Sequence, residues 1–207
     1  MANTLEHKFI RTDSLVDEAF DPKRTRDFKL VLQIGTDGTY IGVNEKTTNK
    51  FIAFERYSFQ DVYRFDDVCN LMDELPKQSA LIKHTYHTVD CLVVNPLSTL
   101  VPKAVYEVDH QKNYLKFNTV LEGDELILAD ELKTLDAKNV FALPFCLKGK
   151  LDYLFTNIQY HHFSSVLIEN LLRQHKNQAS QKVIVHIQAS HFQIVVLEGK
   201  HLVFYNT

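Results

Sequence analysis

The sequence has no tryptophan and is poor in glycine, proline and cysteine, with six, five and three of them among 207 residues. So little glycine and proline argues against collagen-like or low-complexity disordered chains. No apolar run approaches the roughly 20 residues that a membrane-spanning helix needs. The first residues also lack the apolar segment of a signal peptide. We therefore expect a soluble, cytoplasmic protein without membrane insertion.

An excess of positive charge is also absent. The formal net charge is −3 at pH 7, and 45% of the residues are hydrophobic, which is an ordinary value for a globular protein. Such a chain has no long-range electrostatic attraction for nucleic acid. We expect no nucleic-acid partner.

The three cysteines, Cys69, Cys91 and Cys146, are widely spaced and form no C-x-x-C motif. A sparse and odd set of cysteines is typical of a reducing compartment rather than of a disulfide framework. We expect all three to be small buried apolar side chains.

The clearest structural pattern fills residues 28–57. Three β-rich runs, 28–34, 39–44 and 51–57, are separated by turns, and the first turn contains Asp37-Gly38. Asp-Gly between such runs is a strong hairpin signal. A similar pattern closes the chain, with strands expected at 182–186, 191–197 and 201–205.

The middle of the chain alternates between helical and strand patterns. A helix is expected over 62–75, ending at Pro76, followed by a buried strand over 89–94 of the kind found in parallel or mixed sheets. Residues 97–143 read as strand, helix, strand, strand, with Asp109 as a helix cap. A helix then begins at Pro144, a strand covers 158–162, and a further helix is capped by Ser164 or Ser165.

This order predicts an α/β fold with an internal repeat. We expect an N-terminal extension (1–27) that adds an edge strand or helix, and a first domain (28–180) with an inserted subdomain at about 97–143. A second domain starts at 181–207 after a linker at 177–180.

Several separated segments also resemble a known family. They are Leu32–Gly38, Leu100–Pro102, Tyr114–Asn118, Asn139–Pro144 and Leu202–Asn206. They resemble an uncharacterised bacterial family of unknown function with an actin-like ATPase fold, in which two ribonuclease-H-like halves clamp a nucleotide. The resemblance implies a complete first half with an inserted subdomain and, because the sequence stops at Thr207, only the opening hairpin of the second half.

The same resemblance implies where a nucleotide and its metal would bind. Actin-like ATPases place an acidic residue at the end of the first strand of each half, but the matching positions here are Gln33 and His186. An amide and an imidazole are poor ligands for Mg²⁺. We therefore expect no cofactor and no enzymatic activity, but a non-catalytic binding or assembly protein that contacts another protein or a second copy. The alternative is a nucleotide-binding ATPase or phosphotransferase that holds ATP and Mg²⁺ at Gly35, Thr36, Asp37 and Gly38.

Other chemistry has weaker support in the sequence. A ribonuclease-H-type nuclease would need carboxylates where Gln33 and Asn95 stand. The pairs His84/His87 and His161/His162 lack further metal ligands, and adjacent residues of a strand point to opposite faces. We expect surface or capping histidines. A third hypothesis places unrelated enzyme chemistry in 97–143, where it would require a pocket with converging titratable groups.

Overall fold

The computed structural model describes residues 8–178 and 180–207, which form two compact units. Unit 1 contains the described residues up to Val94 together with Pro144–Tyr160, and unit 2 contains Asn95–Leu143 and His161–Thr207. The 97–143 segment therefore groups in space with the closing strands. The expected linker at 177–180 includes residue 179, which lies outside the described residues.

Unit 1 is built on a mixed six-stranded sheet with the strand order β1-β4-β3-β2-β5-β9. Its strands are β1 (Lys8–Val16), β2 (Phe28–Ile34), β3 (Gly38–Glu45), β4 (Lys50–Gln60), β5 (Thr88–Val93) and β9 (Ile158–His162). β2, β3 and β4 form the predicted antiparallel meander, and β5 pairs with β2 in parallel. The hairpins, the buried parallel strand and an edge strand from the N-terminal extension are confirmed.

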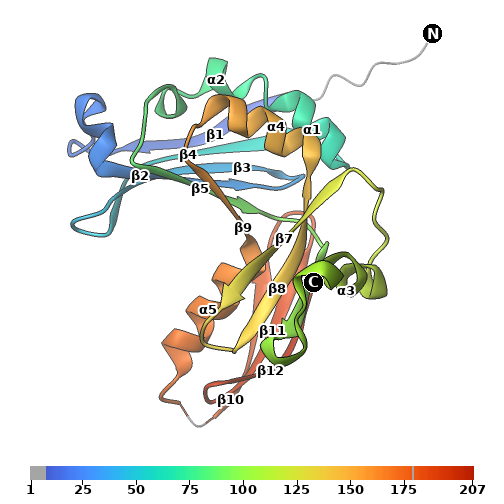
Figure 1. Ribbon diagram of the computed structural model, residues 1–207. Helices are drawn as coiled ribbons and strands as arrows, with labels where there is room; N and C mark the ends of the chain where they lie inside the picture. The colour runs from blue at the N-terminus through green and yellow to red at the C-terminus, as the bar shows by residue number, and fades with distance from the viewer. Residues whose placement is uncertain (1–7, 179) are drawn as a thin grey trace. The chain divides into compact units, whose positions relative to one another are not determined.

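The helices of unit 1 cover one face of this sheet. They are α1 (Phe65–Leu71), α2 (Leu75–Gln78) and α4 (Phe145–Leu154), and all three lie on the same side of the strands in Figure 1. Along β2 and β5, fully buried residues alternate with half-buried ones, as expected when only one face carries helices. The predicted stop at Pro76 is wrong, because this proline lies in the first turn of α2, where a missing N–H group costs nothing.

A disulfide between Cys69 and Cys146 joins α1 to α4. The expectation of three unpaired cysteines is therefore wrong for two of them, since residues 77 positions apart come within 6.0 Å, Cα to Cα, on adjacent helices. Cys91 is free and buried, and burial raises the pKa of its thiol. The expected cytoplasmic location stays a prediction, and the disulfide weighs against it, because disulfides are rare in reducing compartments.

Unit 2 contains two three-stranded sheets, with the orders β6-β8-β7 and β10-β11-β12. Its elements are β6 (Ser98–Pro102), α3 (Gln111–Asn118), β7 (Glu125–Leu132), β8 (Ala137–Pro144), α5 (Phe163–His175), β10 (Gln181–Ile187), β11 (Phe192–Glu198) and β12 (His201–Asn206). The predicted strand, helix, strand, strand order of 97–143 is confirmed. Asp109 does not cap α3, because it lies in a short 3-10 turn, Val108–His110, that precedes the helix.

Two apolar clusters hold unit 2 together. α5 packs through Ile168, Leu171 and Leu172 onto Val195 and Leu197 of β11. A second cluster, around Leu115 of α3, packs on β6 and β8. No described helix of either unit is long and apolar enough to cross a membrane.

Candidate functional site

The turn proposed for nucleotide binding, Gly35–Gly38, connects β2 to β3. Gly35 N–H donates to the carbonyl oxygen of Gly38 at 3.0 Å, and Phe59 N–H donates to that of Asp37 at 3.1 Å. Gly35 and Gly38 are buried, whereas Thr36 and Asp37 are partly exposed. The turn is thus tied both to itself and to β4.

Close packing accounts for both glycines. A Cβ atom on Gly38 would lie 2.2 Å from the carbonyl oxygen of Tyr57, and the φ angle of +157° is one that other residues rarely adopt. A Cβ on Gly35 would lie 3.3 Å from the Cβ of Val94 and 3.0 Å from Oδ1 of Asp37. The absence of a side chain on Gly38 lets β3 approach β4, whereas at Gly35 it leaves room for Val94, which follows β5.

Gln33, at the first acidic position of the actin-like pattern, lies on β2 and faces away from the helices. Its side chain lines a hollow of about 750 Å³ on the open face of the unit 1 sheet. The lining comes from β1 to β5: Leu15, Val16, Asp17, Val31, Gln33, Tyr40, Gly42, Phe51, Ile52, Ala53, Phe54 and Leu92. We call these residues the open face.

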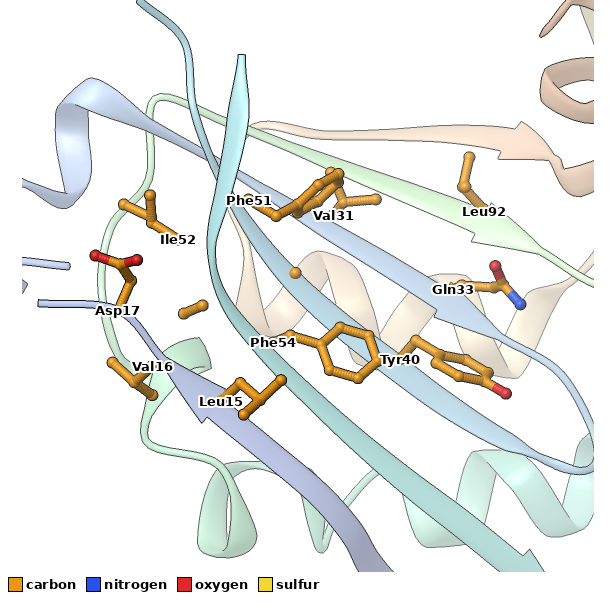
Figure 2. Close-up of a pocket in the computed structure, with 12 residues that line it drawn as sticks. Leu15, Val16, Asp17, Val31, Gln33, Tyr40, Phe51, Ile52, Phe54 and Leu92 are labelled. Atoms are coloured by element: carbon orange, nitrogen blue, oxygen red, sulfur yellow. The ribbon is translucent and has the colours of Figure 1, made fainter. Parts of the chain in front are cut away.

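The open face is an apolar floor with polar groups at its ends. Figure 2 shows Asp17 at one end of the hollow and Gln33 and Tyr40 toward the other, with apolar side chains between them. Phe51 and Leu15 are 62% and 72% exposed. Phe51 lies over Gly42, where a Cβ would come within 2.7 Å of its ring, so this glycine makes room for the aromatic side chain.

Ion pairs stand beside the open face. Lys29 pairs with Asp90, and Arg56 lies 3.9 Å from Asp13. The Arg56 guanidinium also sits 5.3 Å from the centroid of the Tyr40 ring. Among the described residues, no group of three His, Cys, Asp or Glu side chains is arranged to hold a metal ion. The surface is suited to apolar contact and carries no constellation for acid–base or metal chemistry.

Sequence reasoning singled out Gln33 but missed the apolar residues around it. The signal for them was weak, because the positions of β2–β4 that face away from the helices mix apolar residues with polar ones. In β2, for example, Val31 lies between Lys29 and Gln33.

His186, the second position of the pattern, lies on β10 in unit 2. Its ring packs against Phe163 with centroids 5.2 Å apart, and burial, followed by the charge of His191, lowers its pKa. The turn after β10 closes through a hydrogen bond from Gln188 N–H to the His191 carbonyl and contains no glycine. This position packs against α5 and offers no charge to a cation.

A buried polar network surrounds His162 at the junction of β9 and α5. Nε2 of His162 lies 3.0 Å from the carbonyl oxygen of Asn95, so this nitrogen carries the proton. Nδ1 then accepts from the Ser164 hydroxyl at 2.6 Å and from Ser164 N–H. Asn139 of β8 donates to both Ser164 and Ser165. His162 thus caps α5, and the predicted serine caps lie inside the helix.

The centre of the network is closed to solvent, since Ser164 is fully buried and His162 is 1% exposed. Asp130 of β7 accepts from the His162 backbone N–H and from Ser165, and its other oxygen lies 2.8 Å from Nδ1 of His161. His162 is a helix cap, which is one of the roles expected for the histidines.

A groove in unit 2 tests the hypothesis of enzyme chemistry in 97–143. It is lined by residues of β6, β12 and the segment around Asn118, with a volume of about 1040 Å³. Among the described residues that line it, none carries a carboxylate, an imidazole or a cysteine thiol. The required convergence of titratable groups is not met there.

Comparison with known proteins gives a family and a fold. The model of the family described as "Protein of unknown function (DUF3822)" matches residues 17–207. A crystal structure from Bacteroides thetaiotaomicron VPI-5482, of a protein with actin-like ATPase fold and unknown function, matches with a TM-score of 0.81 and 15% identity, over 90% of this chain and 72% of that one.

A second solved structure, the protease–reverse transcriptase of prototype foamy virus, matches 91% of this chain and 25% of its own length at 12% identity. Its TM-score is 0.32, too low to indicate a shared fold. No curated protein matches the chain. The expected α/β fold of the actin-like ATPases is thus confirmed through the Bacteroides protein.

The packing at Gly38 gives a first prediction. Gly38→Ala is expected to lower the free energy of unfolding by about 1–3 kcal/mol, because the new methyl group meets a backbone oxygen that cannot rotate away. Gly149→Ala is the matched control, since nothing lies within 4 Å of its added Cβ in α4, and it should stabilise by about 0.5–1 kcal/mol. Urea unfolding measures both. Equal effects would show that Gly38 is not needed for packing.

The buried imidazole gives a second prediction. Burial lowers the pKa of His162 to about 4, against about 6.5 in an unfolded chain. Between these pH values the imidazole of His162 is protonated in the unfolded chain and neutral in the folded protein. The contribution of His162 to stability is therefore complete above about pH 6.5 and falls by about 3 kcal/mol as the pH drops to about 4.

Urea unfolding at several pH values checks this expectation. His162→Gln should be less stable at pH 7 but lose less stability than the parent between pH 6.5 and 4. The control is His87→Gln, since His87 is exposed. A His162→Gln profile parallel to that of the parent protein would contradict the assignment.

Proposed function

This chain belongs to the DUF3822 family of proteins of unknown function and has an actin-like ATPase fold, and we propose that it is a non-catalytic protein-binding module. The observation that carries the proposal is the open face, where Gln33 stands at the edge of an exposed apolar hollow. Large exposed apolar patches are uncommon on monomeric proteins and usually mark sites that bind another molecule.

The dimensions of the open face favour one kind of occupant. The strands β4, β3, β2 and β5 lie about 4.8 Å apart, which gives a floor about 14 Å wide. An α-helix with its side chains is about 10–12 Å across, so one helix fits this floor. We propose that a partner protein docks an amphipathic helix here, as helices cover the opposite face of the same sheet.

Charge supplies the orientation. Asp17 lines one end of the hollow, whereas the other end carries Gln33 and Tyr40 (Figure 2), with the Arg56 guanidinium 5.3 Å from the centroid of the Tyr40 ring. A helix with a lysine or arginine near the end that meets Asp17 would form an ion pair there, and its apolar stripe would cover Val31, Phe54 and Leu92. Such a rim charge selects the orientation more than it adds affinity.

The expected absence of catalysis is part of the proposal. Support comes from Gln33, which offers no charge to Mg²⁺, and from the two turn glycines, which strand packing explains. We therefore propose that the protein binds a partner protein and binds no nucleotide cofactor.

A defined peptide pair tests helix docking. Two fluorescein-labelled amphipathic helices are compared, identical except for lysine or glutamate near one end, by fluorescence anisotropy. The lysine peptide is expected to bind at least fivefold more tightly, and Leu92→Glu, which puts a charge on the floor, should weaken it at least tenfold. Gln159→Glu is the control, because it adds the same charge to an exposed position outside the hollow. No binding by either peptide, or an unaffected Leu92→Glu, would remove the proposal.

Thermal unfolding with ATP tests the nucleotide alternative. Millimolar ATP with Mg²⁺ should shift the melting temperature by less than about 1 °C, because a ligand stabilises only what it binds. If the parent instead gains several degrees and loses the gain in Thr36→Glu but not in Thr36→Gln, the turn binds phosphate. Thr36 is the better position for this test than the glycines, since its side chain is partly exposed.

A further inference from the structure

The sheet of β10, β11 and β12 has one face that α5 does not cover. The inner face packs on α5 through residues such as Val195 and Leu197. The opposite face carries the alternate residues in register across the three strands: Val183 beside Val196 and Phe204, Val185 beside Ile194 and Asn206, and Ile187 beside Phe192, with Gln181, Glu198 and His201 in the row at one end. We call the seven apolar residues of this face, Val183, Val185, Ile187, Phe192, Ile194, Val196 and Phe204, the outer face.

The uncovered side of this sheet has a large apolar centre. A sheet with one solvated face normally places polar residues on that face. Here polar residues stand only at the margins of the uncovered side, at Asn206 and in the row of Gln181, Glu198 and His201. Exposed fractions on the outer face are 77% for Ile187, 69% for Val183, 54% for Phe192, 51% for Val185 and 48% for Phe204. A surface of this composition is suited to contact with another apolar surface.

We propose that the outer face packs on the outer face of a second copy of this chain, sheet against sheet. The area supports this occupant: the exposed side chains offer roughly 600 Å², at the limit of what monomers leave exposed. Two copies would bury roughly 1,200 Å² in total, at the lower end of the range for stable protein interfaces.

The chemistry of the outer face also favours a second copy. In a twofold interface each residue meets the same surface of its partner, so a face with charges of one sign would repel itself. The seven apolar residues carry no charge, and Glu198, which closes the same side of the sheet at one end, is hydrogen-bonded to Gln181 and lies beside His201. The open face of unit 1, with Asp17 at one end, lacks this self-complementary character.

Packing of one sheet against another uses the faces of the strands and leaves their edges unchanged. Two three-stranded sheets stacked about 10 Å apart would form a six-stranded sandwich in which valine, isoleucine and phenylalanine interdigitate. Unlike the helix docking proposed for unit 1, this contact needs no partner protein.

Sedimentation velocity on the whole 207-residue chain, over a range of micromolar concentrations, tests the proposal. The parent is expected to sediment as a dimer. Ile187→Lys, with Val183→Lys as a second variant, should raise the dimer dissociation constant at least 100-fold, because each places a charge in the apolar interface. Circular dichroism confirms that each variant is folded.

Phe51→Lys is the matched control, because Phe51 is similarly exposed but lies on the open face of unit 1. It should remain a dimer and lose helix binding, so that failure of one proposal is distinguished from failure of the other. A parent that is monomeric throughout would overturn the dimer. The proposal would also be overturned if the parent associates, as a dimer or a larger species, and the folded Ile187→Lys and Val183→Lys variants associate equally strongly.

Discussion

The parallel pairing of β5 with β2 constrains the rest of unit 1. Two parallel neighbours cannot be joined by a tight turn, so the chain must cross over one face of the sheet, and α1 and α2 form that crossover. α4 then lies on the same face, joined to α1 by the Cys69–Cys146 disulfide and to the segment after α1 by the ion pair between Lys150 and Asp73. Because α1, α2 and α4 lie on one side, the alternate residues of β2, β3 and β4 form the open face, in which apolar Val31 and Phe54 lie beside polar Gln33.

Local patterns in the sequence predicted the elements well, because their causes are local. Asp37-Gly38 between β-rich runs determines a hairpin whatever the rest of the chain does, and the alternation along β2 follows from the pleat of a strand. The features that sequence reasoning missed depend on distant residues. Cys69 meets Cys146 only after two helices have packed side by side, and His162 becomes a helix cap only because Asn95 accepts from the other side of its ring.

Prediction of the candidate site failed for a related reason. A glycine turn after a buried strand has the same sequence whether it binds phosphate or lets two strands approach, and only the 2.2 Å between a Cβ on Gly38 and the Tyr57 oxygen reveals the packing role. The open face was visible only indirectly, since Val31 and Leu92 read as core residues until the position of the helices is known. Gln33 was informative because the sequence alone shows that an amide, which has no charge for Mg²⁺, stands at this position. The surroundings of Gln33 could not be predicted from the sequence in the same way.

The open face and the outer face differ in the polar groups that surround their apolar residues. On the open face, the carboxylate of Asp17 and the amide of Gln33 lie at different places around the apolar floor, so an occupant in the wrong orientation would leave a charge or amide unmatched. On the outer face, valine, isoleucine and phenylalanine fill the centre, and polar side chains such as Asn206 and Glu198 stand only at its margins. A polar mark is needed to recognise a different protein, whereas a uniform apolar face suffices for an identical one. This difference is why we assign the first face to a partner and the second to self-association.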